Sequence, residues 1–155
     1  MVRIEEHKHL TEHKAIEAAP LPAKVVIPLL QHLGKPCDIL KVRPEDMVRR
    51  GQLLATSEKG VFAPVHASIS GKVVAIGDHS HPLAGFSRAI TIESDGQDLA
   101  DSSVVDRSAQ AVDALTPEDL KKIIFEAGIV GLGGAPFPTH IKLSPAQPIQ
   151  DFILN

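Results

Sequence analysis

The segment with the most chemical content is a glycine-rich loop late in the sequence, which contains Gly131, Gly133 and Gly134 and is followed by Lys142. Backbone without side chains lets a ligand approach closely, and consecutive N–H groups can form a nest for a phosphate. Lys142 would add a positive charge beside the same anion. A Gly-x-Gly-Gly run is equally typical of a tight loop between a helix and the next element, and it fits neither the dinucleotide fingerprint nor the P-loop. Both interpretations stay open at this level.

The cysteine and the histidines offer little further chemistry. Cys37 is the only cysteine, so the chain forms no internal disulfide and cannot supply the four thiolates of an iron–sulfur cluster by itself. His79 and His81 form a His-x-His pair, and three more histidines stand near the start, at positions 7, 9 and 13. No carboxylate or thiolate stands at ligand spacing, so we interpret these rings as solvated and predict no metal site. No Ser/His/Asp or paired-carboxylate set suggests a catalytic residue.

A helix is expected to lead into the glycine loop. Thr116 is a typical N-cap, Pro117 suits the first helical position, and Asp119 is placed to complete a capping box. The residues on its apolar face are Leu120, Ile123, Ile124 and Ala127. Gly128 then predicts the end of the helix.

The first half of the sequence is different, because short β-favouring runs alternate with turn signals. These runs are 25–27, 38–42, 52–55, 61–63, 71–76 and 89–92. Their length and frequency predict a small sandwich or barrel. We therefore divide the chain into an arm (1–22), a β domain (23–93), a linker (94–115) and the beginning of a further α/β domain (116–155).

Two of the runs follow related patterns. The segments 41–54 and 63–76 each read as a turn, a valine or isoleucine, a glycine and a strand, and Gly51 and Gly71 stand where the chain would need positive φ. This pairing resembles the barrel-sandwich hybrid of biotinyl and lipoyl domains. Such domains carry a modified lysine between their halves, and Lys59 lies in about that place. A non-catalytic carrier or docking module is therefore an alternative function.

The wider loop sequence favours another family. The string from Gly131 to Thr139, followed by Lys142, resembles the flavin loop shared by the C subunit of Rnf electron-transport complexes and the NADH-oxidising flavoprotein of respiratory complex I. The segments 20–37 and 63–71 are similar to the N-terminal barrel of the Rnf protein, which complex I lacks. Pro136 departs from the motif, because it stands where the family has glycine and has no N–H to donate.

The resemblance to the Rnf C subunit implies a function for the loop. FMN would bind there, with NADH nearby and the 4Fe-4S clusters in parts of the full-length protein outside this fragment. The residues that the resemblance assigns to cofactor binding are Gly131, Gly133, Gly134, Ala135, Phe137, Thr139, Lys142 and Asn155. The implied partners are NADH and the other subunits of an ion-translocating complex. The truncated piece alone is expected to be inactive.

Composition agrees with a protein of this kind. A net charge of -3 with both signs interspersed gives no basic stripe for nucleic acid. The longest apolar run, 25–30, falls far short of the roughly 20 residues that span a bilayer. The charged opening lacks the apolar run of a signal peptide. We expect a cytoplasmic protein that is peripheral on the membrane.

Overall fold

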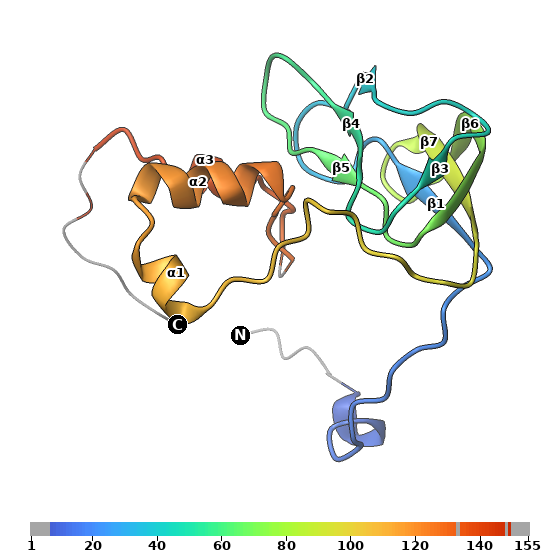
Figure 1. Ribbon diagram of the computed structural model, residues 1–155, viewed down its shortest axis with the longest axis horizontal. Helices are drawn as coiled ribbons and strands as arrows, with labels where there is room; N and C mark the ends of the chain where they lie inside the picture. The colour runs from blue at the N-terminus through green and yellow to red at the C-terminus, as the bar shows by residue number, and fades with distance from the viewer. Residues whose placement is uncertain (1–6, 133, 148, 150–155) are drawn as a thin grey trace.

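The computed structural model describes residues 7–132, 134–147 and 149. A β barrel occupies one side of the molecule and short helices the other, while the N-terminal arm leads away from both (Figure 1). The arm contains the 3-10 helix η1 (Lys8–Leu10), and its described residues up to Ala23 are exposed. Within the described ranges, no helix is long and apolar enough to cross a membrane.

The barrel consists of two antiparallel sheets. The first has the order β1-β7-β6-β3, with β1 (Lys24–Pro28), β7 (Gly85–Ser94), β6 (Gly71–His81) and β3 (Met47–Val48). The second has the order β2-β4-β5, with β2 (Ile39–Leu40), β4 (Leu53–Thr56) and β5 (Val65–His66). The two sheets enclose an aliphatic core, in which Leu54, Val73, Ile90 and Ile92 have no exposed surface. Each such side chain contributes roughly 1.5–3 kcal/mol by its burial.

The predicted turn glycines are confirmed. Gly51 has a φ of 87° and Gly71 a φ of 155°. A Cβ at Gly71 would lie 1.9 Å from the carbonyl oxygen of Glu93 on the neighbouring strand, so only glycine allows β6 and β7 to pair at this point. The turn before β3 is less regular, because Glu45 takes a φ of 79° without being glycine.

Of the predicted strands, one is wrong and two are confirmed but are longer than predicted. The run 61–63 is not a strand, and β5 begins two residues later, at Val65. The runs 71–76 and 89–92 are parts of β6 and β7, which continue into a long hairpin. Polar residues such as Asp78 and His79 hide this extension in the sequence, because beyond the barrel neither face of the hairpin needs to be apolar.

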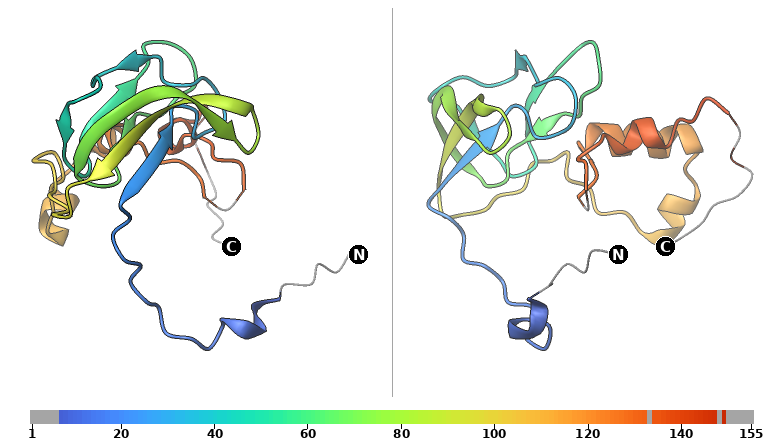
Figure 2. Two further views of the ribbon diagram at one scale, coloured as in Figure 1. Left: turned by 90° about the vertical axis from the view of Figure 1, so that its right-hand side faces the viewer. Right: turned by 180° about the vertical axis from the view of Figure 1, so that it is seen from behind.

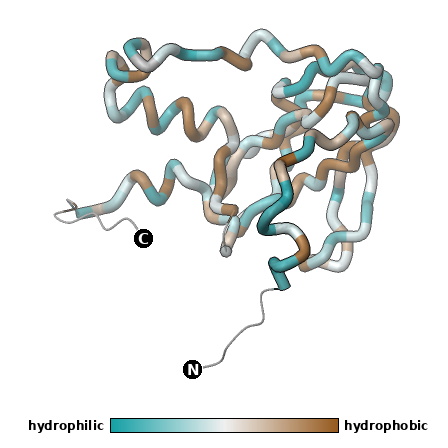
Figure 3. The backbone as a smooth tube through the Cα atoms, turned by 90° about the horizontal axis from the view of Figure 1, so that it is seen from below, coloured by the Kyte–Doolittle hydropathy of each residue, from teal (hydrophilic) through white to brown (hydrophobic). Residues whose placement is uncertain are grey.

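The predicted helix is confirmed as α2 (Pro117–Glu126), with the capping box between Thr116 and Asp119. Both interactions of the box are present, so the amides of Thr116 and Asp119 have hydrogen-bond partners at the start of α2. Two shorter helices flank it, α1 (Ala109–Asp113) and α3 (Thr139–Lys142). Figure 3 shows hydrophobic residues gathered in the barrel and recurring along the helical part.

The segment predicted as a linker follows the barrel before it reaches the helices. The Ser70 hydroxyl donates to the Asp95 carboxylate at 2.7 Å and accepts from the Leu99 amide at 2.9 Å. Hydrogen bonds from Ser70 and from the Gln97 amide lower the pKa of Asp95, since they favour its charged form. The Arg50 Nε donates to both carboxylate oxygens of Asp98, at 3.0 and 3.1 Å. The first part of the segment is therefore fixed to the barrel.

Candidate functional site

The glycine loop connects α2 to α3 and is closed at its base by backbone hydrogen bonds. Gly128 ends α2 with a φ of 69°. The chain then forms an antiparallel bridge between Val130 and Pro138, and the Gly131 amide donates to the Phe137 carbonyl at 3.0 Å. The loop is therefore narrow, with a paired base and a projecting crest, which we define as residues 132, 134 and 135.

The predicted residues at the base of the loop have structural contacts. The Gly131 amide is occupied by Phe137, and a Cβ at Gly131 would lie 3.0 Å from the Ala135 carbonyl oxygen. The Phe137 amide donates to that same carbonyl at 2.7 Å. In this conformation the amides of Gly131 and Phe137 both donate to carbonyl groups of the loop itself. The absence of a side chain at Gly131 permits tight closure of the loop.

The crest of the loop is open. Leu132 is 95% exposed, Gly134 and Ala135 are also exposed, and a Cβ at Gly134 would meet no atom within 4 Å. Gly133 and Asn155, two further predicted cofactor-binding residues, lie outside the described residues. Any anion site in this conformation would thus involve the crest amides and not the base.

The remaining predicted residues lie at the two ends of α3. Thr139 is half-buried at its first position, and its amide donates to the Ile129 carbonyl at 3.0 Å. Lys142 is exposed in the last turn, and the part of the chain that the structure describes gives it no ion pair. Its charge is therefore available to an anion near α3.

Pro136 anchors the loop to the barrel. Its carbonyl oxygen accepts a hydrogen bond from the Leu33 amide at 2.9 Å. Proline has no N–H, but this contact uses only its carbonyl group, so the departure from the family motif is compatible with a fixed loop.

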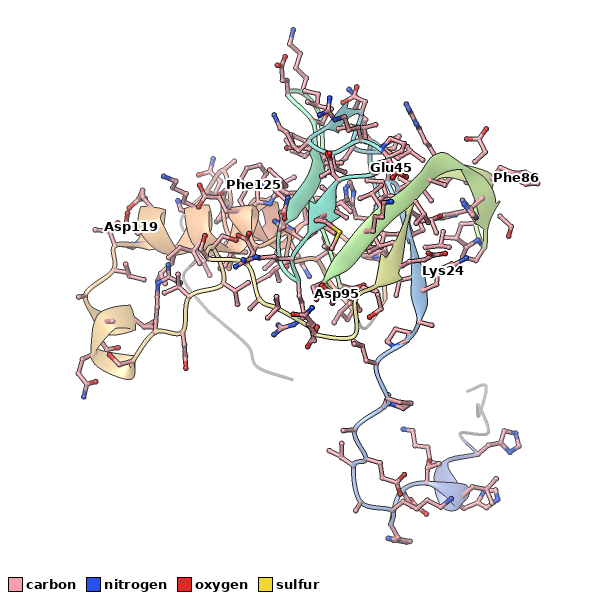
Figure 4. All side chains as sticks on the ribbon, turned by 45° about the vertical axis from the view of Figure 1, so that its right-hand side comes forward. Lys24, Glu45, Phe86, Asp95, Asp119 and Phe125 are labelled. Atoms are coloured by element: carbon pink, nitrogen blue, oxygen red, sulfur yellow. The ribbon has the colours of Figure 1, made fainter. Side chains whose placement is uncertain are left out.

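Aromatic contacts extend this connection between the barrel and the helices. Phe125 of α2 makes edge-to-face contacts with Phe62 of the barrel, at 5.5 Å between ring centroids, and with His140 of α3, at 4.7 Å. Figure 4 shows Phe125 at the barrel end of α2. Burial lowers the pKa of His140, and its Nδ1 atom is buried without a hydrogen-bond partner. His140 is therefore a neutral packing residue at ordinary pH.

His66 lies beneath the end of α2. Burial lowers its pKa, and the backbone groups of Glu126 and Pro64 partly oppose this shift. A Cβ at Gly128 would lie 3.2 Å from the His66 ring and 2.3 Å from the Pro64 carbonyl oxygen. Gly128 thus serves both to end the helix and to let it approach β5.

A groove of about 660 Å³ lies between the barrel and α2. Its lining includes Leu53, Pro64 and His66 from the barrel, Val104 and Arg107 from the following segment, and Ile123 from α2. None of the predicted cofactor-binding residues lines it. Sequence reasoning missed this groove because its walls come from three segments far apart in the chain.

The other residues singled out in the sequence are placed as follows. Cys37 is 1% exposed, its thiol donates to the Ala63 carbonyl at 3.2 Å, and burial raises its pKa to about 11. It is therefore a poor nucleophile. Lys59 is exposed in the loop between β4 and β5. Among the described residues, no three His, Cys, Asp or Glu side chains gather in a way that could hold a metal ion.

Comparison with known proteins agrees with this fold. The family model of the RnfC barrel sandwich hybrid domain matches residues 2–97. The architecture is thus a barrel-sandwich hybrid, as the two related half-patterns predicted. The chain belongs to the RnfC family.

Similar proteins cover almost the whole chain. It is 44% identical, over 99% of its length, to the C subunit of the proton-translocating ferredoxin:NAD(+) oxidoreductase complex of Clostridium ljungdahlii. It is 39% identical, over 86%, to the C subunit of the Na(+)-translocating complex of Acetobacterium woodii. It is 37% identical, over 90%, to the C subunit of the ion-translocating oxidoreductase complex of Rhodobacter capsulatus. The chain spans only 34%, 30% and 27% of the lengths of these relatives.

Proposed function

We propose that this chain is the N-terminal part of the C subunit of an ion-translocating ferredoxin:NAD(+) oxidoreductase complex, peripheral on the cytoplasmic face of the membrane. The observation that carries the proposal is the similarity to such subunits over 99% of the chain, at 44% identity. Because the chain spans about a third of that relative, the activity belongs to the longer protein. This part contributes a docking barrel and a loop for the cofactor.

The loop is proposed to hold the phosphate of FMN at its crest, with NADH binding nearby. The open space at Gly134 and the exposed Lys142 support this placement. Crest amides would donate to the phosphate, and Lys142 would balance its charge. The Gly131 amide takes no part, because it is bonded to Phe137. Bound FMN would supply hydride acceptance from NADH and one-electron transfer to the 4Fe-4S clusters of the full-length protein.

A pair of glycine substitutions in the full-length protein tests the loop. Gly134→Val places a side chain at the crest, where the space is open and φ lies outside the left-handed region, so we expect folding to be preserved. If the phosphate lies against this backbone, the Kd for FMN rises at least about tenfold, which corresponds to about 1.4 kcal/mol. Gly77→Val is the matched control, because Gly77 on β6 has equally open space far along the chain from the loop. Equal affinities of the two variants for FMN, measured by flavin fluorescence, would refute the role of the crest.

The docking role of the barrel has one rival, a carrier function in which Lys59 is covalently modified. Its exposure in the loop between β4 and β5 is the observation in favour. Intact-mass measurement of the protein from its native host decides between the two. An adduct on Lys59 identifies a carrier, whereas the unmodified mass leaves the barrel as a docking domain.

A further inference from the structure

The outer part of the β6–β7 hairpin projects from the barrel. We define the hairpin tip as residues 79–87. In Figure 4, Phe86 stands at the far end of this hairpin, on the side of the molecule away from α2, and Figure 2 shows the hairpin extending past the strands beside it. Phe86 therefore lies at the end of the barrel away from α2.

Two large apolar side chains of the tip face solvent. Leu83 is 89% exposed and Phe86 is 73% exposed. By contrast, Ala89 and Ile90, a few residues along β7, are completely buried. Burying a leucine or phenylalanine contributes roughly 1.5–3 kcal/mol, and neither residue gains this within the chain. Exposed aromatic residues at a projecting point are typical anchors of protein interfaces.

The tip is also held in one conformation. The His81 Nδ1 accepts from the amides of Leu83 and Ala84, at 3.2 and 3.1 Å. Because Nδ1 accepts, the ring proton of the neutral imidazole is on Nε2, which donates to the Leu30 carbonyl at 2.9 Å. His81 thus fixes the turn and joins it to the chain after β1. A prearranged tip loses little conformational entropy on binding.

The charge of the tip indicates the kind of surface that it fits. Residues 79–87 contain no Asp, Glu, Lys or Arg; the flanking charges, Asp78 and Arg88, have opposite sign and face each other in the hairpin register. Attachment to an anionic bilayer depends on basic side chains beside the apolar ones, and the tip offers no excess of them. An uncharged apolar pocket on a protein is complementary to it.

We propose that the hairpin tip docks this chain onto another protein subunit of the complex by inserting Phe86 and Leu83 into an uncharged apolar pocket. The choice of a fellow subunit rests on the function proposed above, because the relatives are named as subunits of complexes.

The test uses the complete complex, isolated from its host through an affinity tag on the full-length protein. In one variant Leu83→Ser and Phe86→Ser are combined. The matched control combines Met47→Ser and Leu99→Ser, which are 61% and 44% exposed. Met47 pairs with Lys72 at the opposite end of β6, so the control changes apolar surface far from the tip.

We expect the tip variant to recover roughly tenfold less of the other subunits than the wild type, since truncating an aromatic anchor weakens an interface strongly. The control should recover them at the wild-type level, and both variants should keep the wild-type thermal midpoint. Equal recovery by the tip variant and the wild type would overturn the proposal and leave the proposed function intact. Failure of the wild type itself to recover other subunits would overturn both.

A photoreactive phenylalanine at position 86 identifies what the tip touches. A single cross-linked product with another subunit of the complex supports the proposal. Cross-links mainly to lipid, or to a second copy of the same chain, overturn it.

Discussion

Glu45 provides a direct test of backbone strain in the barrel. It has a φ of 79°, a conformation that suits glycine, and its amide donates to the Val73 carbonyl at 2.8 Å. Its carboxylate also forms an ion pair with Lys72, at a site where the two side chains are 74% and 45% exposed. In Figure 4 the labelled Glu45 lies over β6. Replacing it with glycine or alanine separates the strain from the ion pair.

The size of the effect follows from three contributions. A residue with a Cβ in the left-handed region costs roughly 1–2 kcal/mol. Glycine removes this cost but gains about 0.4–1 kcal/mol of entropy in the unfolded state. Loss of an exposed ion pair costs about 0.2–1 kcal/mol and is common to both variants. We therefore expect Glu45→Gly to be roughly 0.5–1 kcal/mol more stable than Glu45→Ala.

Urea unfolding followed by far-UV circular dichroism measures this difference, because the chain has no tryptophan or tyrosine for intrinsic fluorescence. Lys41 is the matched control. It is exposed and lies in the same turn region, but its φ is not positive. There the order should reverse, so that Lys41→Ala is more stable than Lys41→Gly. If Glu45→Ala equals or exceeds Glu45→Gly in stability, the strain argument is wrong.

Other positions give equally specific expectations. Gly71→Ala should abolish cooperative unfolding or lower the thermal midpoint sharply, because its Cβ would lie 1.9 Å from the Glu93 carbonyl oxygen. Gly77→Ala is the control and should change the midpoint little, because a Cβ at Gly77 would meet no atom within 4 Å. His140→Phe should raise the unfolding free energy by about 1 kcal/mol in urea titrations, since it removes a buried nitrogen without a partner and keeps the ring. Burial raises the pKa of Cys37 from 9.0 to about 11, so stability should fall as the pH rises from 9 to 11, and in Cys37→Ala this part of the pH dependence should disappear.

The elements with strong local signals were predictable from the sequence. The capping box at Thr116 and Asp119 and the terminating glycine at Gly128 defined α2 within a residue at each end. The repeated turn patterns around Gly51 and Gly71 indicated the barrel. These features depend on residues adjacent in the chain, where propensity and capping act directly.

Contacts between distant segments were not predictable in the same way. Nothing near Pro136 shows that its carbonyl accepts from Leu33, and no periodicity brings Phe62 onto Phe125. The length of the β6–β7 hairpin was likewise not predictable from the sequence. The outer parts of both strands lie beyond the core and need no alternation of apolar and polar residues. In each case the tertiary arrangement, and not the local sequence, determines the geometry.

In the glycine loop, the motif alone did not show why each glycine is there. Its residue types suggested amides turned toward an anion, yet the Gly131 amide faces the Phe137 carbonyl, and of the two glycines that the structure describes in this loop, Gly134 is the one with open space. A glycine can be required either for ligand approach or for close packing of the chain on itself, and the sequence does not separate these reasons. The available room separates the two reasons. At Gly131 a Cβ would lie 3.0 Å from the Ala135 carbonyl oxygen, so a substitution should shift the loop slightly. At Gly134 a Cβ would meet no atom within 4 Å, so a substitution should leave the fold intact and affect only what binds there.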